Sequence, residues 1–114
     1  MAITSDVQGR LTASADSVEL SCGGLAGAAF EVLGTYSGTI TFEGRIGSGA
    51  YTAILFAPST TLVGASTTTS TGIFFGHVGG LTSVRARMSS YSSGNALVTA
   101  RAVESSPGLA ITVA

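Results

Sequence analysis

The chain has 114 residues, the size of one domain, and its 45% apolar content excludes a disordered chain even though only 10% of the residues are charged. A net charge of −1 with no lysine gives no field that would favour nucleic acid or an anionic membrane. The single cysteine, Cys22, excludes a disulfide within the chain, and no segment reaches the roughly 18 consecutive apolar residues of a membrane helix.

The first ten residues are polar and weakly patterned, with no basic stretch followed by an apolar run, so we expect an N-terminal arm over residues 1–10 and no signal peptide. We expect a single β-sandwich domain over residues 11–114. Short apolar stretches recur along it between turn signals. The expected strands are, in chain order, residues 10–14, 17–22, 28–33, 38–46, 50–57, 72–78, 82–90, 95–104 and 109–113. Turns are expected at residues 23–24, 47–49, 79–80, 92–95 and 106–108, and residues 59–71 as a loop or an irregular edge strand.

Alternation of apolar and polar residues is clear in two of these strands. In residues 38–46, the apolar face holds Ile40 and Phe42, and the other face holds Thr39, Thr41, Glu43 and Arg45. In residues 82–90, the apolar face holds Val84, Ala86 and Met88, and the other face holds Ser83, Arg85 and Arg87. Half-buried antiparallel strands have this pattern. The continuous apolar runs at 52–57 and 72–75 instead suggest strands buried on both faces or against a partner.

About eight short strands in a chain of this length predict an all-β fold. Because a sheet with one apolar face must be covered by a second layer, we expect a two-layer antiparallel β-sandwich of the jelly-roll or Greek-key type. Cys22 is then expected to be a small buried apolar residue.

Groups that could carry chemistry are few. His77 is the only histidine, which excludes a metal site built on a histidine pair, and the six acidic residues lack ligand spacing. No Gly-x-Ser-x-Gly elbow is present, and the glycine-rich residues 44–49 match a hairpin turn far better than a phosphate loop. We therefore expect no enzymatic activity, no catalytic or metal-binding residues and no cofactor.

The arginines of the expected strands are better candidates for function. Arg45, Arg85 and Arg87 lie on outward faces, and the planar guanidinium group suits protein interfaces. Glu43 shares the face of Arg45, and a solvated charge pair between these two is the simplest interpretation. The candidate interface residues are thus Glu43, Arg45, Arg85 and Arg87, with ordinary solvated arginines as the alternative.

A set of short motifs runs between residues 34 and 102: Gly-Thr-Tyr-Ser-Gly-Thr at 34–39, Phe-Glu-Gly at 42–44, Val-Arg-Ala-Arg at 84–87, Tyr-Ser-Ser-Gly at 91–94 and Val-Thr-Ala-Arg-Ala at 98–102. This pattern resembles a small β-sandwich module that is common in structural proteins of tailed bacteriophages, and the resemblance covers roughly residues 28–103. It departs from the module at Tyr36, where tryptophan is usual, and at residues 44–51, where a longer turn is usual.

The resemblance implies a virion structural protein. For a module with only short arms, it favours a capsid decoration (cement) protein, made in the host cytoplasm and located in the virion. Its implied partners are the major capsid protein, other virion proteins and further copies of itself, with a trimer favoured and with neither nucleic acid nor membrane. One alternative is a neck, tail or baseplate component with the same fold. Another is a carbohydrate-binding adhesin module, for which the candidate aromatic residues are Tyr36, Tyr51 and Tyr91.

Overall fold

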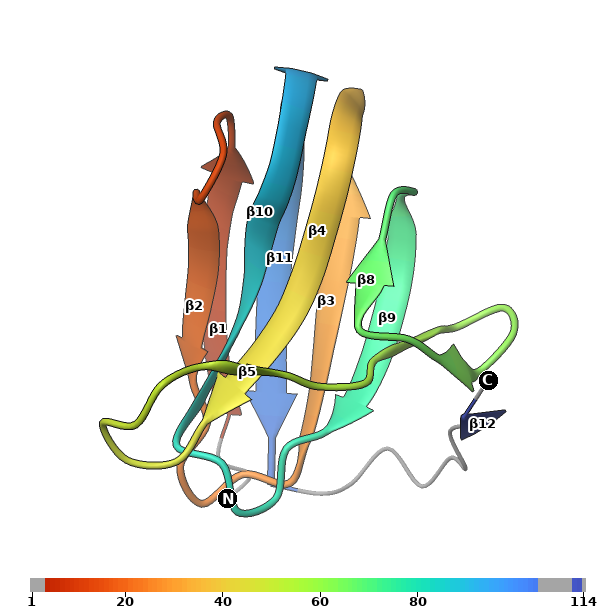
Figure 1. Cartoon of the computed structure of the whole chain (residues 1–114). Coiled ribbons are helices and arrows are strands. Elements are labelled where there is room, and N and C mark those ends of the chain that lie inside the picture. Colours follow the sequence, from red (N-terminus) through yellow and green to blue (C-terminus); the bar gives the residue numbers. More distant parts are fainter. Residues whose placement is uncertain (1–3, 105–111, 114) are drawn as a thin grey trace.

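The structure is a computed structural model that describes residues 4–104 and 112–113. Two antiparallel sheets pack face to face, with sheet B in front of sheet A in Figure 1. Sheet A has the strand order β1 (Thr4–Leu11), β11 (Ala96–Val103), β3 (Gly27–Leu33), β9 (Gly72–His77), β6 (Ala57–Pro58). Sheet B has the order β2 (Ser17–Ser21), β10 (Ser83–Gly94), β4 (Tyr36–Arg45), β5 (Thr52–Ala53), with β8 (Thr67–Thr68) also paired to β4. A short parallel pair joins β7 (Val63–Gly64) and β12 (Thr112–Val113).

The predicted two-layer all-β sandwich is confirmed. The long strands alternate between the layers along the chain, because β1, β3, β9 and β11 belong to sheet A and β2, β4 and β10 to sheet B. No helix that could cross a membrane occurs in residues 4–104 or 112–113.

Two very short crossings between the sheets meet at the upper end of Figure 1. The amide of Asn95, between β10 and β11, donates to the carbonyl of Thr35, between β3 and β4, over 3.0 Å. Gly34 and Gly94 take φ values of +96° and +77°, and a Cβ atom on Gly94 would lie 2.2 Å from the carbonyl oxygen of Thr35. Only glycine fits this backbone conformation and this close approach.

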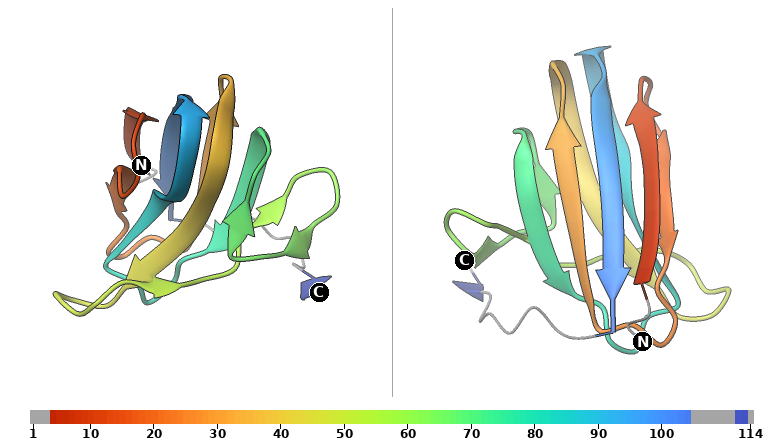
Figure 2. Two further views of the ribbon diagram at one scale, coloured as in Figure 1. Left: turned by 45° about the horizontal axis from the view of Figure 1, so that its top comes forward. Right: turned by 180° about the vertical axis from the view of Figure 1, so that it is seen from behind.

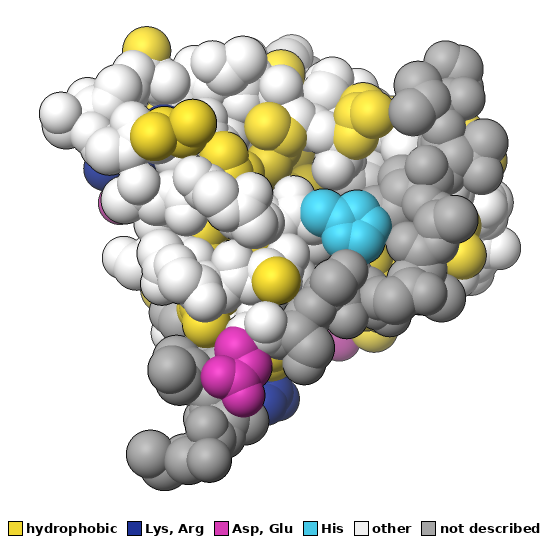
Figure 3. Space-filling model, turned by 90° about the horizontal axis from the view of Figure 1, so that it is seen from below, with side chains coloured by type: hydrophobic (Ala, Val, Ile, Leu, Met, Phe, Trp, Pro, Cys, Tyr) yellow, Lys and Arg dark blue, Asp and Glu magenta, His cyan; other side chains and the backbone are white. Residues whose placement is uncertain are grey.

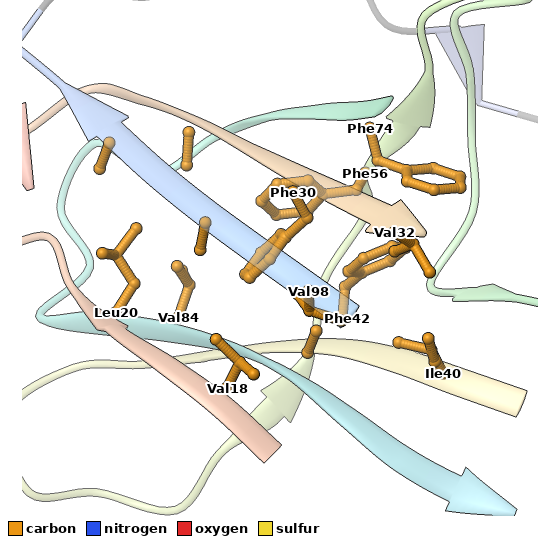
Figure 4. Close-up of a cluster of buried hydrophobic side chains, with 14 of the residues drawn as sticks. Val18, Leu20, Phe30, Val32, Ile40, Phe42, Phe56, Phe74, Val84 and Val98 are labelled. Atoms are coloured by element: carbon orange, nitrogen blue, oxygen red, sulfur yellow. The ribbon is translucent and has the colours of Figure 1, made fainter. Parts of the chain in front are cut away.

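Four phenylalanine rings form the centre of the core between the sheets (Figure 4). Phe30, Phe42 and Phe56 have centroids 5.1–5.6 Å apart, and Phe74 lies 5.3 Å from Phe42. The predicted inward faces of β4 and β10 are confirmed, since these residues are fully buried: Ile40, Phe42, Val84, Ala86 and Met88. Cys22 is buried beside them, as expected.

The first strand differs from the prediction. A strand was expected over residues 10–14, but β1 spans Thr4–Leu11, so residues 4–10 of the expected arm form an edge of sheet A. The apolar pattern is weak because the inward position between Val7 and Leu11 is Gly9, where a Cβ atom would lie 3.0 Å from Val18. Strand β4 also begins earlier than expected, at Tyr36, which places Gly38 inside the strand.

The single strand expected over residues 50–57 is wrong. The chain forms β5, leaves sheet B, and reaches sheet A at β6, with Phe56 bridged to Ala65 on the way. The apolar run marks this crossing rather than a strand buried on both faces, and Leu55 is 42% exposed. In β9 the apolar run at 72–75 likewise alternates, with Phe74 buried and Ile73 exposed.

Most of the remaining predictions are confirmed in outline. Turns lie at residues 23–24, 47–49 and 79–80, and residues 59–71 contain the short strands β7 and β8. The connection over 92–95 is tighter than expected, because β10 runs to Gly94 and only Asn95 separates it from β11. The turn expected at 106–108 and most of the strand expected at 109–113 lie outside the described residues, apart from β12.

Candidate functional site

The structure brings the four candidate interface residues together on the outer face of sheet B. Strands β4 and β10 are neighbours there, and their register places Arg85 opposite Glu43 and Ser83 opposite Arg45. Arg87 is two residues further along β10, on the same face. Residues 43, 45, 85 and 87 therefore form one cluster, although they come from two separate sequence motifs.

Glu43 is the centre of this cluster. Its Oε1 atom accepts hydrogen bonds from Arg85 Nε at 2.7 Å and Arg87 Nε at 3.0 Å, and Arg87 Nη2 donates to its Oε2 at 3.1 Å. The Glu43 side chain is only 10% exposed. The expected solvated pair between Glu43 and Arg45 is therefore wrong. The reason is register, because β10 places two guanidinium groups nearer to this carboxylate than Arg45, which lies on the same strand.

The two arginines hold Glu43 in its charged form. Hydrogen bonds from Arg87, and then from Arg85, lower the pKa of the Glu43 carboxyl below its ordinary value, against the opposing effect of burial. The same contact raises the pKa of Arg87. Removing the carboxylate would leave two half-buried guanidinium groups close together without their shared partner.

Tyr51, from the loop between β4 and β5, covers the cluster. Its ring lies 3.9 Å from Arg85 Cζ and 4.8 Å from Arg45 Cζ, both cation–π distances. Its hydroxyl donates to Glu19 of β2 and is 3.0 Å from Ser83 Oγ. Burial, followed by the bond to Glu19, raises the pKa of Tyr51. Arg45 Nη2 also lies 3.8 Å from Glu19 Oε2.

We use the name "sheet B cluster" for these residues: Glu19, Glu43, Arg45, Tyr51, Ser83, Arg85 and Arg87. Sequence reasoning placed Ser83 on the face of Arg85 and Arg87, but it did not connect Glu19 or Tyr51 to the arginines. Alternation along "SVELS" would have placed Glu19 on the outward face of β2, since Val18 and Leu20 are buried. No sequence signal indicates that the loop folds Tyr51 back over β10.

The sheet B cluster presents charged side chains that are suited to binding a partner. Three guanidinium groups and two carboxylates leave one excess positive charge, and each guanidinium is partly exposed. Because contacts with Glu43 and Tyr51 already restrict Arg85 and Arg87, these side chains lose little further freedom on binding a partner. Among the described residues, no group of three or more His, Cys, Asp or Glu side chains could hold a metal ion.

A groove of about 340 Å³, lined mainly by apolar residues but also by Arg45 and Thr52, opens at this end of β4. The lining residues include Gly44, Ile46, Ala50, Ile54 and Leu81. The Ile46 side chain at this groove is 72% exposed. Seen from below, the part of the surface that the structure describes is mainly uncharged, and charged side chains lie near its margin (Figure 3). An apolar groove next to ordered arginines has the composition of a protein interface.

The three tyrosines considered for carbohydrate binding are engaged within the protein. Tyr36 donates to the carbonyl of Ser70 at 2.9 Å, and Tyr91 donates to the carbonyl of Gly94 at 3.0 Å. Tyr51 has Arg85 over its ring. Burial also raises the pKa of Tyr36. These contacts occupy groups that a sugar would otherwise contact, so the structure gives no support to a glycan site built on the tyrosines.

Comparison with known proteins identifies the fold. No protein-family model matches the chain, and no curated protein sequence matches it. Among solved structures, YomS, an SPBc2 prophage-derived protein, is similar with a TM-score of 0.77 and 20% identity, over 90% of this chain and 95% of YomS. XepA, an exported protein of PBSX, is similar with a TM-score of 0.73 and 22% identity, over 88% of this chain but only 38% of XepA. This chain therefore has the same sandwich fold as YomS and as one part of XepA.

Proposed function

We propose that the chain is a structural protein of a bacteriophage virion and, more specifically, a capsid decoration protein that binds the head lattice. The observation that carries this proposal is the likeness to prophage-derived YomS, because it extends over nearly the whole of both chains. The motifs between residues 34 and 102 support a virion structural role independently of the structure, and the decoration role rests on the shortness of the arms around the module. No catalytic step is part of the proposal.

The sheet B cluster is the surface that would face the capsid. Its ordered guanidinium groups would donate hydrogen bonds to carboxylates or backbone carbonyls of the major capsid protein, and the groove at Arg45 would hold an apolar side chain. A decoration protein stabilises a shell because it binds the assembled lattice more tightly than free subunits. Among the described residues, no feature selects the three-fold arrangement that the resemblance favours.

Binding to assembled capsids tests this proposal. Arg45→Ala removes a partly exposed, ion-paired arginine of the sheet B cluster, and Arg101→Ala is the control, because Arg101 is also ion-paired but lies on sheet A. In co-sedimentation with capsids of the phage that carries the gene, we expect Arg45→Ala to weaken binding about tenfold and Arg101→Ala to leave it unchanged. Equal effects of the two variants would show that the surface is wrongly assigned.

Electron microscopy of the virion tests the location. Density for the chain on the head lattice supports a decoration role. Density confined to the neck, tail or baseplate would show instead that the chain is a component of that part of the virion. Absence of the chain from purified virions would exclude both.

A further inference from the structure

Strand β1 gives sheet A a long open edge. Its eight residues pair with β11 in an unbroken register and with no other strand among the described residues (Figure 2, right). Its other edge therefore presents backbone N–H and C=O groups that no described strand takes up. The opposite edge of sheet A is different, because β6 has only two residues and one of them is Pro58. Strand β1 contains neither a proline nor a bulge that would block a further strand.

The outward side chains of β1 contact residues of β11 and the connection that precedes it. Gln8 Nε2 donates to Thr99 Oγ1 at 2.9 Å, and Arg10 Nη1 donates to Asn95 Oδ1 at 2.9 Å. Asp6 Oδ1 lies 3.6 Å from Arg101 Nε. The sequence thus places a negative, a neutral and a positive residue at alternate positions on one face of the edge strand.

This order of charges is self-complementary. When two copies of β1 run antiparallel and centre on Gln8, Asp6 of each copy faces Arg10 of the other copy, and the two Gln8 side chains face each other. On the inward face, Val7 lies opposite Gly9, which leaves space for the larger side chain. Directly opposed residues of antiparallel strands have Cβ atoms about 4.5–5.5 Å apart, close enough for ion pairs.

We propose that the chain forms a two-fold dimer in which the β1 strands of two copies pair antiparallel about Gln8 and join the two A sheets into one. A closed two-fold arrangement uses the same patch on both copies, as this pattern requires. Edge strands that avoid pairing usually carry repelling charges, a proline or a bulge, whereas the charges of β1 attract a second copy. The inference does not depend on the virion role, because it concerns the chain free in solution.

Two single charge reversals test the register. In Asp6→Arg, both cross-copy pairs become Arg–Arg, and in Arg10→Asp both become Asp–Asp, so each variant alone should dimerise at least about tenfold more weakly than the wild type. In an equimolar mixture, residue 6 of one variant faces the opposite charge at residue 10 of the other in both pairs. The mixture should therefore form a heterodimer with nearly wild-type affinity, as measured by sedimentation velocity.

The matched control is Glu31→Arg, which makes the same change of charge on β3, two strands away from the edge. We expect it to dimerise like the wild type. Circular dichroism of each variant checks that it is folded. A wild-type chain that remains monomeric at about 1 mM would overturn the proposal, because its two edges would then attract each other too weakly to form a specific dimer. Failure of the two folded variants to associate on mixing, or dissociation by Glu31→Arg alone, would also overturn it.

Discussion

The charge of Glu43 should contribute measurably to stability, and Glu43→Gln isolates that contribution because it keeps the shape of the side chain. The wild-type carboxylate accepts three charge-assisted hydrogen bonds from Arg85 and Arg87. Exposed ion pairs contribute about 0–1 kcal/mol, whereas breaking a buried one costs about 3–5 kcal/mol. Glu43 is 10% exposed and its partners are 26% and 30% exposed, so the site lies between these limits. We expect a loss of about 2 kcal/mol.

Urea unfolding at pH 7 measures this loss. For a protein of this size, about 2 kcal/mol corresponds to a decrease of roughly 1 M in the urea midpoint. The matched control is Glu31→Gln on the outer face of sheet A, since Glu31 forms no ion pair among the described residues, and its midpoint should stay near that of the wild type. Equal midpoints for the two variants would refute the reasoning.

The pH dependence of the same pair of proteins gives a second check. The pKa of Glu43 is lowered from its ordinary value of 4.5, so its contribution is present above that pH and is lost as the pH falls through the lowered value. The stability difference between wild type and Glu43→Gln should therefore stay constant above the ordinary pKa of 4.5 and shrink as the pH falls below it toward the lowered pKa. The pKa of Asp16 is also lowered, by hydrogen bonds from Thr12. Because Asp16 is present in both proteins, its pH-dependent contribution cancels in the stability difference between them. A difference that grows on acidification would contradict this assignment.

Three further substitutions test the packing. Gly38→Ala should destabilise by more than about 2 kcal/mol in thermal unfolding, since its Cβ would lie 2.4 Å from the carbonyl oxygen of Ser90, whereas Gly79→Ala, with open space around it, should have little effect. Phe42→Ala should lower the free energy of unfolding in urea by about 3–5 kcal/mol, because Phe42 contacts the other three rings of the core. A decrease of less than about 1 kcal/mol would show that the ring cluster is misplaced. Tyr51→Phe should cost about 1 kcal/mol by losing the hydroxyl contacts to Glu19 and Ser83, and an unchanged stability would argue against that contact pair.

Local patterns in the sequence were sufficient to predict the faces of the strands but not their neighbours. Alternation placed Phe42 and Val84 in the core and Glu43 and Arg85 outside it, because side-chain direction in a strand depends only on parity. Whether Glu43 meets Arg45 or Arg85 depends on which strand lies alongside and in what register. That information is spread over the whole chain, so the sequence predicted that Glu43 and Arg85 face outward but not which residues they contact.

Two segments were predicted wrongly for different physical reasons. Strand β1 has an open edge and a glycine at an inward position, so it lacks the apolar signal of an inner strand. The apolar run at 52–57 is explained by a crossing between sheets, where Phe56 is buried and Leu55 is exposed. Hydrophobicity alone does not distinguish such a crossing from a strand buried on both faces.

The strand order also constrains how a nascent chain can fold. Strand β11 separates β1 from β3 in sheet A, and β10 separates β2 from β4 in sheet B. A polypeptide that has left the ribosome only as far as residue 82 would therefore have a gap in each layer where these two strands belong. Contacts so distant in sequence make folding slow, on the order of milliseconds to seconds for β-sandwiches. We expect the sandwich to form only after synthesis of Val103, and chains cut short before β10 to expose unpaired strands and aggregate.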